Sequence, residues 1–102
     1  MKTRESIRID FANAMKQASL ADDCAEELRM AERSVNELIN EINSGWTGEA
    51  ATLYLEKCEL LAKKINKSSN DMKKISSTIA KTAKIYYETE KAALEVVRHK
   101  SH

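Results

Sequence analysis

The 102-residue chain contains no proline, and its only two glycines, Gly45 and Gly48, stand three positions apart near the middle of the sequence. Proline and glycine are the residues that most often end helices and form turns. Glycine adopts positive φ at little cost, so Gly45 is predicted to follow the end of one helix and Gly48 to release the backbone before the next. The sequence therefore predicts one reversal, at residues 44–47, between two long arms.

Both arms repeat apolar or small residues at alternating steps of three and four, the pattern of amphipathic helices. In the first arm this stripe comprises Ile7, Phe11, Ala14, Ala18, Ala21, Ala25, Leu28, Val35, Ile39 and Ile42. In the second arm it comprises Ala51, Tyr54, Cys58, Leu61, Ile65, Ser68, Met72, Ile75, Ile79, Thr82, Tyr86, Thr89, Ala93 and Val96. We expect an all-α chain that forms a single domain over residues 1–102, with antiparallel helices at about 5–43 and about 48–98.

Further apolar side chains flank the two stripes and widen them beyond what one neighbouring helix covers. They are Met30, Ala31, Leu38, Leu53, Leu55, Leu60, Ile85, Leu94 and Val97. Two helices packed only on each other also form a thin core. The sequence therefore predicts that two chains dimerise into a four-helix bundle.

Charge and hydropathy limit the possible partners. A net charge of +1 gives no general attraction to nucleic acid, although residues 1–48 carry −3 and residues 49–102 carry +4. No apolar run approaches the roughly 18 residues of a membrane span, so direct membrane insertion is not expected. The first residues lack the apolar segment and cleavage site of a secretory signal peptide.

Residues that could carry chemistry are sparse. The two cysteines, Cys24 and Cys58, are not in a C-x-x-C pair, the histidines lie at the C-terminus, and no glycine-rich phosphate loop occurs. A hairpin places the two cysteines roughly 15 Å out of register, so no disulfide is expected and Cys58 is predicted to be a small buried residue. Glu32 occupies a stripe position and is expected to turn to water or pair with Arg29. We expect no enzyme activity, no metal and no cofactor.

A tryptophan and a glycine mark the turn itself, as Trp46-Thr47-Gly48. Two further features follow, a tyrosine at Tyr54 and a tyrosine four residues before an acid, Tyr86 and Glu90. Trp46 could simply cap the end of the bundle and bury its ring there. Taken together, the features resemble the WXG (ESAT-like) family, helical hairpins of about 100 residues exported by type VII secretion systems.

The resemblance implies a function for four residues. In that family a C-terminal Tyr-x-x-x-Asp/Glu motif, here Tyr86 and Glu90, forms part of an export signal that the partner's Trp46 and Gly48 would complete. It also implies a homodimer, or a heterodimer with a related hairpin, that engages a membrane-associated secretion ATPase. The protein would be cytoplasmic before export and then secreted without a cleavable signal peptide.

Two alternatives stay open at this point. Tyr86 also falls on the apolar stripe, where it would be a core residue instead of an accessible signal. The chain could also be an intracellular helical adaptor or chaperone that binds a partner helix and is never exported.

Overall fold

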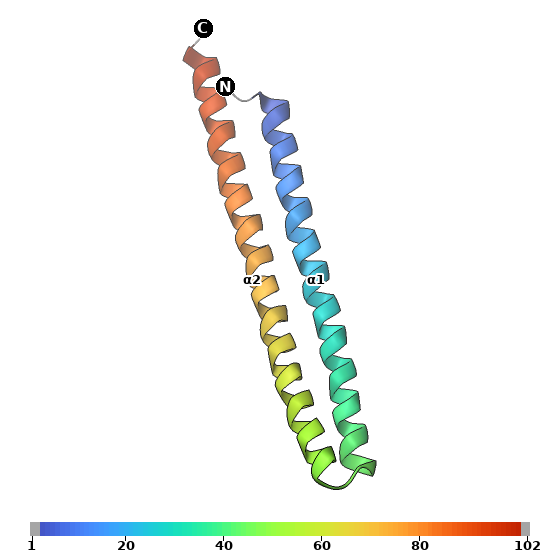
Figure 1. Ribbon diagram of the computed structural model, residues 1–102. Helices are drawn as coiled ribbons and strands as arrows, with labels where there is room; N and C mark the ends of the chain where they lie inside the picture. The colour runs from blue at the N-terminus through green and yellow to red at the C-terminus, as the bar shows by residue number, and fades with distance from the viewer. Residues whose placement is uncertain (1–2, 101–102) are drawn as a thin grey trace. The chain divides into compact units, whose positions relative to one another are not determined.

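Two helices make up the computed structural model, which describes the backbone of residues 3–100 and the side chains of residues 3–97. Helix α1 spans Arg4–Gly45 and helix α2 spans Glu49–Lys100, and no strand occurs in the described residues (Figure 1). The chain is therefore all-α. Each helix is slightly longer than its expected range, and residues 46–48 separate them.

Helix α1 begins at a side-chain cap, Thr3, that was not predicted from the sequence. The Thr3 hydroxyl oxygen accepts a hydrogen bond of 3.0 Å from the Ser6 backbone N–H. The Thr3 carbonyl accepts a further bond from the Ile7 N–H at 3.0 Å. Threonine at this position satisfies an N–H group that has no partner within the helix, and Glu5 adds a negative charge in the first turn.

The two glycines of the turn behave differently. Gly48 has a φ of 99°, so the predicted release of the backbone at this residue is confirmed. The prediction that Gly45 follows the helix is wrong, since it is the last residue of α1. The reason is that the Trp46 N–H donates to the Ile42 carbonyl at 3.0 Å, which keeps the last turn helical.

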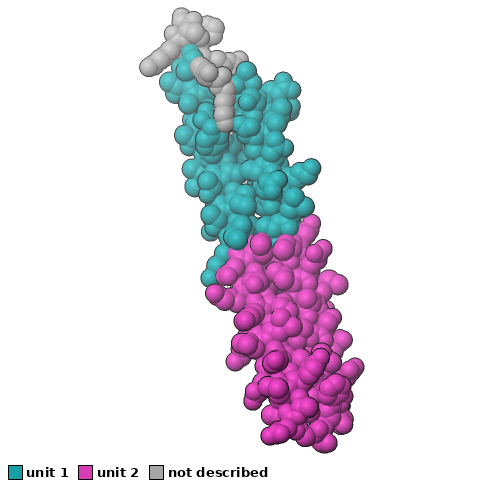
Figure 2. All heavy atoms as spheres, in the orientation of Figure 1, with its two compact units in different colours: residues 1–21, 74–102 teal, residues 22–73 magenta. Residues whose placement is uncertain are grey.

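The structure divides into two compact units, coloured separately in Figure 2. Unit 1 comprises residues 1–21 and 74–102, and unit 2 comprises residues 22–73. Each helix contributes one segment to each unit. Each unit is described by itself below, and a single domain over residues 1–102 stays a prediction.

Unit 2 contains a cluster of buried apolar residues. Its centre is formed by Ile42, Ala51 and Cys58, against which Val35, Ile39 and Leu55 pack. Cys58 is buried, as predicted, and neither cysteine forms a disulfide. This cluster holds the end of α1 against the start of α2.

Two buried serines show how closely the helices approach in each unit. In unit 2 the Ser69 hydroxyl donates to the Ala25 carbonyl at 3.0 Å. In unit 1 the Ser76 hydroxyl donates to the Ala18 carbonyl at 2.9 Å. A side chain as short as serine reaches a backbone carbonyl of another helix only where nothing larger separates the two backbones. The alanines of α1 therefore allow close contact with α2.

The predicted stripe of α1 is confirmed, because each of its residues is buried or half-buried. The predicted stripe of α2 is wrong at nine of its fourteen positions, including every position after Ile79. Tyr54, Leu61, Ser68, Ile75, Thr82, Tyr86, Thr89, Ala93 and Val96 are exposed. The side that faces α1 instead carries Ala51, Leu55, Cys58, Ala62, Ile65, Ser69, Met72, Ser76, Ile79, Ala83, Tyr87, Glu90 and Leu94, all buried or half-buried.

The size of the side chains explains the difference. At several places in α2 two adjacent residues, such as Leu61 and Ala62, each fit the three-four repeat. The sequence pattern alone therefore does not decide which of the two faces α1. Where α1 presents Ala18 and Ala25, Ser76 and Ser69 approach its backbone so closely that a leucine or isoleucine would not fit, because interior packing is dense and overfilling is destabilising. Close packing therefore turns Ala62 and Ser76 inward and leaves their larger neighbours Leu61 and Ile75 outside.

Candidate functional site

The turn presents a large aromatic side chain to solvent. Trp46 is 54% exposed, and its ring lies beside that of Tyr54, with centroids 5.8 Å apart and planes tilted by 54°. The interpretation that Trp46 is buried over the last apolar layer is therefore wrong for this chain. The pair instead forms an exposed aromatic surface at the turn of unit 2.

Gly48 shapes this surface through its backbone alone. Its φ of 99° is a conformation that residues with a side chain rarely adopt. A Cβ atom added there would meet no atom within 4 Å, so space is not the constraint. The Gly48 carbonyl then accepts the Thr52 N–H at 3.2 Å in the first turn of α2. Gly48 thus fixes how the chain leaves Trp46 and enters α2.

In unit 1, two adjacent tyrosines have different environments. The Tyr87 ring packs against that of Phe11, with centroids 4.8 Å apart, whereas Tyr86 is 43% exposed. In this part of α2 the residues that face α1 are at positions 79, 83, 87, 90 and 94. Two intervals of four residues therefore follow each other, where the regular pattern alternates intervals of three and four. Such an irregular step shifts the buried side around the helix. The shift makes Tyr87 the packed residue and leaves Tyr86 outside the seam.

A mostly apolar groove of about 410 Å³ lies next to Tyr86 in unit 1. It is lined by Ile7, Asp10, Phe11, Ala14, Thr78, Ile79, Thr82, Ala83, Tyr86 and Tyr87. The first four of these belong to α1 and the others to α2. Tyr86 therefore forms part of the wall of a groove between two helices.

The structure places the four predicted signal residues in two groups. Trp46 and Gly48 lie together at the turn of unit 2, and Tyr86 and Glu90 lie one helical turn apart in unit 1. Glu90 is half-buried and Tyr86 exposed. The packing role of Tyr87 was not predicted from the sequence, where the adjacent tyrosines Tyr86 and Tyr87 were the only indication of it.

Truncating the two tyrosines is expected to have unequal effects on stability. We expect Tyr87→Ala to lower the free energy of unfolding by about 2–3 kcal/mol, because the mutation removes the ring packed on Phe11. We expect Tyr86→Ala and Glu90→Gln each to change it by about 1 kcal/mol or less. Urea unfolding followed by circular dichroism measures all three. Equal losses for the two tyrosines would contradict this assignment of the seam.

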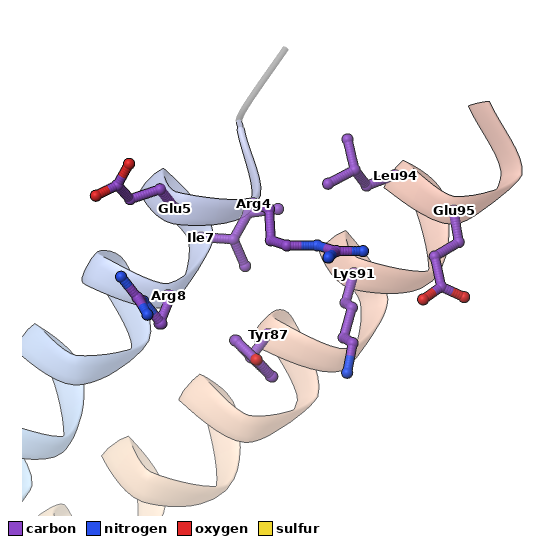
Figure 3. Close-up of a pocket in the computed structure, with 8 residues that line it drawn as sticks. All are labelled: Arg4, Glu5, Ile7, Arg8, Tyr87, Lys91, Leu94 and Glu95. Carbon is purple, nitrogen blue, oxygen red and sulfur yellow. The ribbon is translucent and has the colours of Figure 1, made fainter. Parts of the chain in front are cut away.

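A second cleft of unit 1, of about 640 Å³, lies between the start of α1 and the last part of α2 (Figure 3). Its lining includes the cations Arg4, Arg8 and Lys91 and the acids Glu5 and Glu95. Apolar lining comes from Ile7, Tyr87 and Leu94. The Lys91 ammonium lies 6.0 Å from the centre of the Tyr87 ring. Charges of both signs line this cleft, so it does not select for one kind of ion.

Glu32 does not pair with Arg29, which corrects the sequence-based expectation. An oxygen of the Glu32 carboxylate accepts a hydrogen bond of 3.3 Å from the Asn66 amide, across the helices of unit 2. A guanidinium nitrogen of Arg29 lies 3.8 Å from a carboxylate oxygen of Glu26, one turn earlier in α1. The expectation considered only neighbours of Glu32 along α1, whereas its hydrogen-bond partner, Asn66, lies on α2.

The residues that the structure describes lack two features found in other classes of protein. Among these residues, no group of three or more His, Cys, Asp or Glu side chains is placed to hold a metal ion. Neither helix, over the residues described, contains a segment apolar enough to cross a bilayer. The most distinctive surface features are therefore the aromatic turn and the groove beside Tyr86.

Comparison with known protein families gives a match over most of the chain. The family model WXG100, described as proteins of 100 residues with WXG, matches residues 6–91. No curated protein and no solved structure matches the chain. The matched range includes the Trp46-x-Gly48 turn and all four predicted signal residues, and it covers most of the sequence. The chain therefore belongs to the WXG100 family, the ESAT-like proteins of type VII secretion.

Proposed function

We propose that this protein is a substrate or partner of a type VII secretion system, and that it acts as a dimer whose export signal is shared between two chains. WXG100 proteins are in general non-enzymatic secretion proteins that form dimers. The observation that carries the proposal is the exposed Trp46 ring, held at the turn by the positive φ of Gly48. One half of the signal would be Trp46 and Gly48 of one chain, and the other half Tyr86 and Glu90 of its partner.

The exposure of Trp46 supports a role in binding. A large aromatic ring gains stability when buried, and tryptophan is enriched among residues that dominate binding energies. This ring is more than half exposed although the nearby cluster of Ile42, Ala51 and Cys58 is buried. Folding of the single chain therefore leaves Trp46 available to another molecule.

The position of Tyr86 supports the second half of the signal. Tyr87 provides the packing on Phe11, so Tyr86 is not needed for that contact. Tyr86 lines the mostly apolar groove of unit 1, and Glu90 follows one turn later. An aromatic wall, an apolar groove and a nearby carboxylate are features that a second chain or a receptor could recognise.

The exposed apolar residues of α2 support dimerisation. Leu53, Tyr54, Leu60 and Leu61 in unit 2, and Ile75, Ile85, Tyr86 and Val96 in unit 1, are all exposed. Exposed apolar surface on this scale is typical of an interaction site. We propose that a second two-helix chain, either another copy or a related hairpin, covers it to form a four-helix bundle. A membrane-associated secretion ATPase would then bind the dimer.

Export is expected to depend on that ATPase. In a cell with the intact secretion system, the protein should be found in the culture medium by immunoblot. Deleting the ATPase should remove it from the medium while the amount inside the cells is kept or rises. A cytoplasmic marker protein, blotted on the same samples, controls for lysis.

The same experiment separates the proposal from its alternative. An intracellular adaptor or chaperone would stay in the cell pellet in both strains. The same amount in the medium with and without the ATPase would also contradict the proposal, because export would then not require type VII secretion.

A further inference from the structure

The turn of unit 2 lies in the middle of an acidic part of the sequence. Residues 34–56, all of which belong to unit 2, include four Glu and no Lys, Arg or His, a net charge of −4. Every one of these carboxylate residues is exposed: Glu37, Glu41, Glu49 and Glu56. The exposed Trp46 ring is therefore surrounded in sequence by negative charge alone.

The ends of the two helices do not change this sign. The C-terminus of α1 carries a partial negative charge and the N-terminus of α2 a partial positive one. Both ends meet at the turn, so these partial charges oppose each other (Figure 1). The last turn of α1 has no basic residue, and Glu49 adds a full negative charge to the first turn of α2. The side chains therefore make the surroundings of the turn negative.

Trp46 and Tyr54 add an aromatic surface to these negative surroundings. Each residue is 54% exposed, and the two ring centroids are 5.8 Å apart. The face of an aromatic ring attracts cations, and tryptophan does so most strongly. A contact of this kind occurs in unit 1, where the Lys91 ammonium lies 6.0 Å from the centre of the Tyr87 ring. The rings and the carboxylates of the turn thus favour the same kind of partner, a cation.

We propose that the turn of unit 2 binds an arginine-bearing segment of its receptor in the secretion system, with the guanidinium stacked on the Trp46 ring and attracted by the surrounding carboxylates. This inference rests on the proposed function and names the chemistry of the partner that contacts the turn. Arginine fits better than lysine, because a planar guanidinium stacks on an aromatic face and is less strongly hydrated than an ammonium. The rings supply contact area, and the carboxylates select a cation.

The charges disfavour other partners at this surface. An acidic segment would be repelled by a net charge of −4, and a neutral apolar segment would gain nothing from the carboxylates. The shared signal proposed above would itself bring one more carboxylate, the partner's Glu90, towards the turn. An arginine between these carboxylates pairs with both, so a cationic receptor also relieves the repulsion within the signal.

The first test uses Trp46 as a reporter. It is the only tryptophan, so the one indole N–H signal in a proton–nitrogen correlation NMR spectrum belongs to it. The full chain is titrated with a capped peptide of alternating glycine and arginine, and with matched peptides that carry glutamine or glutamate instead. The arginine peptide should shift this signal and bind about fivefold or more tightly than the glutamine peptide, and the glutamate peptide should leave it unchanged. Equal binding of the arginine and glutamine peptides would overturn the inference.

A lysine peptide tests the stacking. Lysine keeps the charge of arginine but lacks its planar group, so this peptide should bind about twofold or more weakly than the arginine peptide. Equal binding of the two would overturn the stacked arginine, because charge alone would then explain the affinity.

The second test compares two double variants with the same chemical change. Glu49→Gln with Glu56→Gln neutralises two carboxylates near the turn and should weaken binding of the arginine peptide by about fivefold or more. Glu26→Gln with Glu27→Gln removes the same charge about 20 residues before Trp46, roughly 30 Å along α1, and should change binding less than about twofold. All four glutamates are exposed in unit 2. Circular dichroism verifies that both variants are helical, and equal weakening by the two would overturn a site at the turn.

Binding and export are measured separately, so failure of the inference is distinguishable from failure of the proposed function. An arginine peptide that leaves the indole signal unchanged at millimolar concentration would overturn the inference, whereas ATPase-dependent export would still support the function. Export that does not need the ATPase would contradict the function, whatever the peptide does. In cells, Glu49→Gln with Glu56→Gln should reduce export and Glu26→Gln with Glu27→Gln should not. Equal export of the two variants would overturn the assignment of the arginine-bearing segment to the receptor.

Discussion

Trp46→Ala is expected to abolish export while the protein stays helical and dimeric. The Trp46 side chain is 54% exposed, so its removal takes little buried surface from the folded chain. Its one described ring contact, with Tyr54, lies at the surface of the turn. Immunoblots of culture medium and cell pellet measure export, and circular dichroism with ultracentrifugation measures folding and assembly.

Leu20→Ala is the matched control for this experiment. Leu20 is 52% exposed, close to the 54% of Trp46, and lies on α1, outside both the Trp-x-Gly motif and the proposed dimer surface of α2. We expect this variant to be exported. Loss of helix in Trp46→Ala would favour a structural capping role for the tryptophan, and normal export of a folded Trp46→Ala protein would remove the residue from the signal.

Substitutions at Gly48 separate backbone conformation from recognition. Gly48→Ala is expected to cost about 1–2 kcal/mol of stability, because alanine is strained at a φ of 99° even though space is open around it. Asparagine tolerates left-handed conformations better than alanine. Gly48→Asn should therefore be more stable than Gly48→Ala, and if the turn conformation is what matters, it should also be exported better.

Ile42→Ala is expected to cause the largest loss of stability among single truncations of the core. Ile42 is 2% exposed and lies at the centre of the buried cluster of unit 2, next to Ala51 and Cys58. Removing its three outer carbons loses apolar burial and leaves a cavity, which should cost about 3 kcal/mol. For a chain of this size such a loss lowers Tm by roughly 10 °C or more. Calorimetry at a fixed protein concentration checks it, because Tm of a dimer depends on concentration.

Ile42→Val is the graded control. It removes one methyl group from the same site and should cost about 1 kcal/mol. A loss of less than 1 kcal/mol for Ile42→Ala would mean that this cluster does not hold the two helices of unit 2 together. Export of both variants should follow the amount of folded protein, because Ile42 is buried and does not belong to the proposed signal.

The sequence predicted the helices and the turn because their signals are local. The glycines, Gly45 and Gly48, occur only at the turn, and the chain has no proline. The apolar residues of α1 recur with helical spacing. These two signals predict two helices with one reversal, which is what the structure contains. The family could also be identified from the sequence, since the Trp46-x-Gly48 motif is a contiguous pattern. Within the candidate site, the sequence was enough to name the four motif residues. It was not enough to predict the packing role of Tyr87 or the groove beside Tyr86.

The sequence by itself determined the apolar stripe of α1, because its apolar and small residues recur at helical spacing, and each of them is buried or half-buried. In α2 it determined only that an apolar stripe exists. Pairs such as Leu61 and Ala62, or Tyr86 and Tyr87, fit the repeat equally well. The choice between them depended on α1, whose alanines bring the helices so close that Ser69 and Ser76 reach its carbonyls. Tyr86 and Tyr87 are equally large, so the choice in that pair depended on Phe11 of α1, against which the Tyr87 ring packs. Only the tertiary structure could settle both choices, because the neighbours and the space at each position are set by the opposite helix.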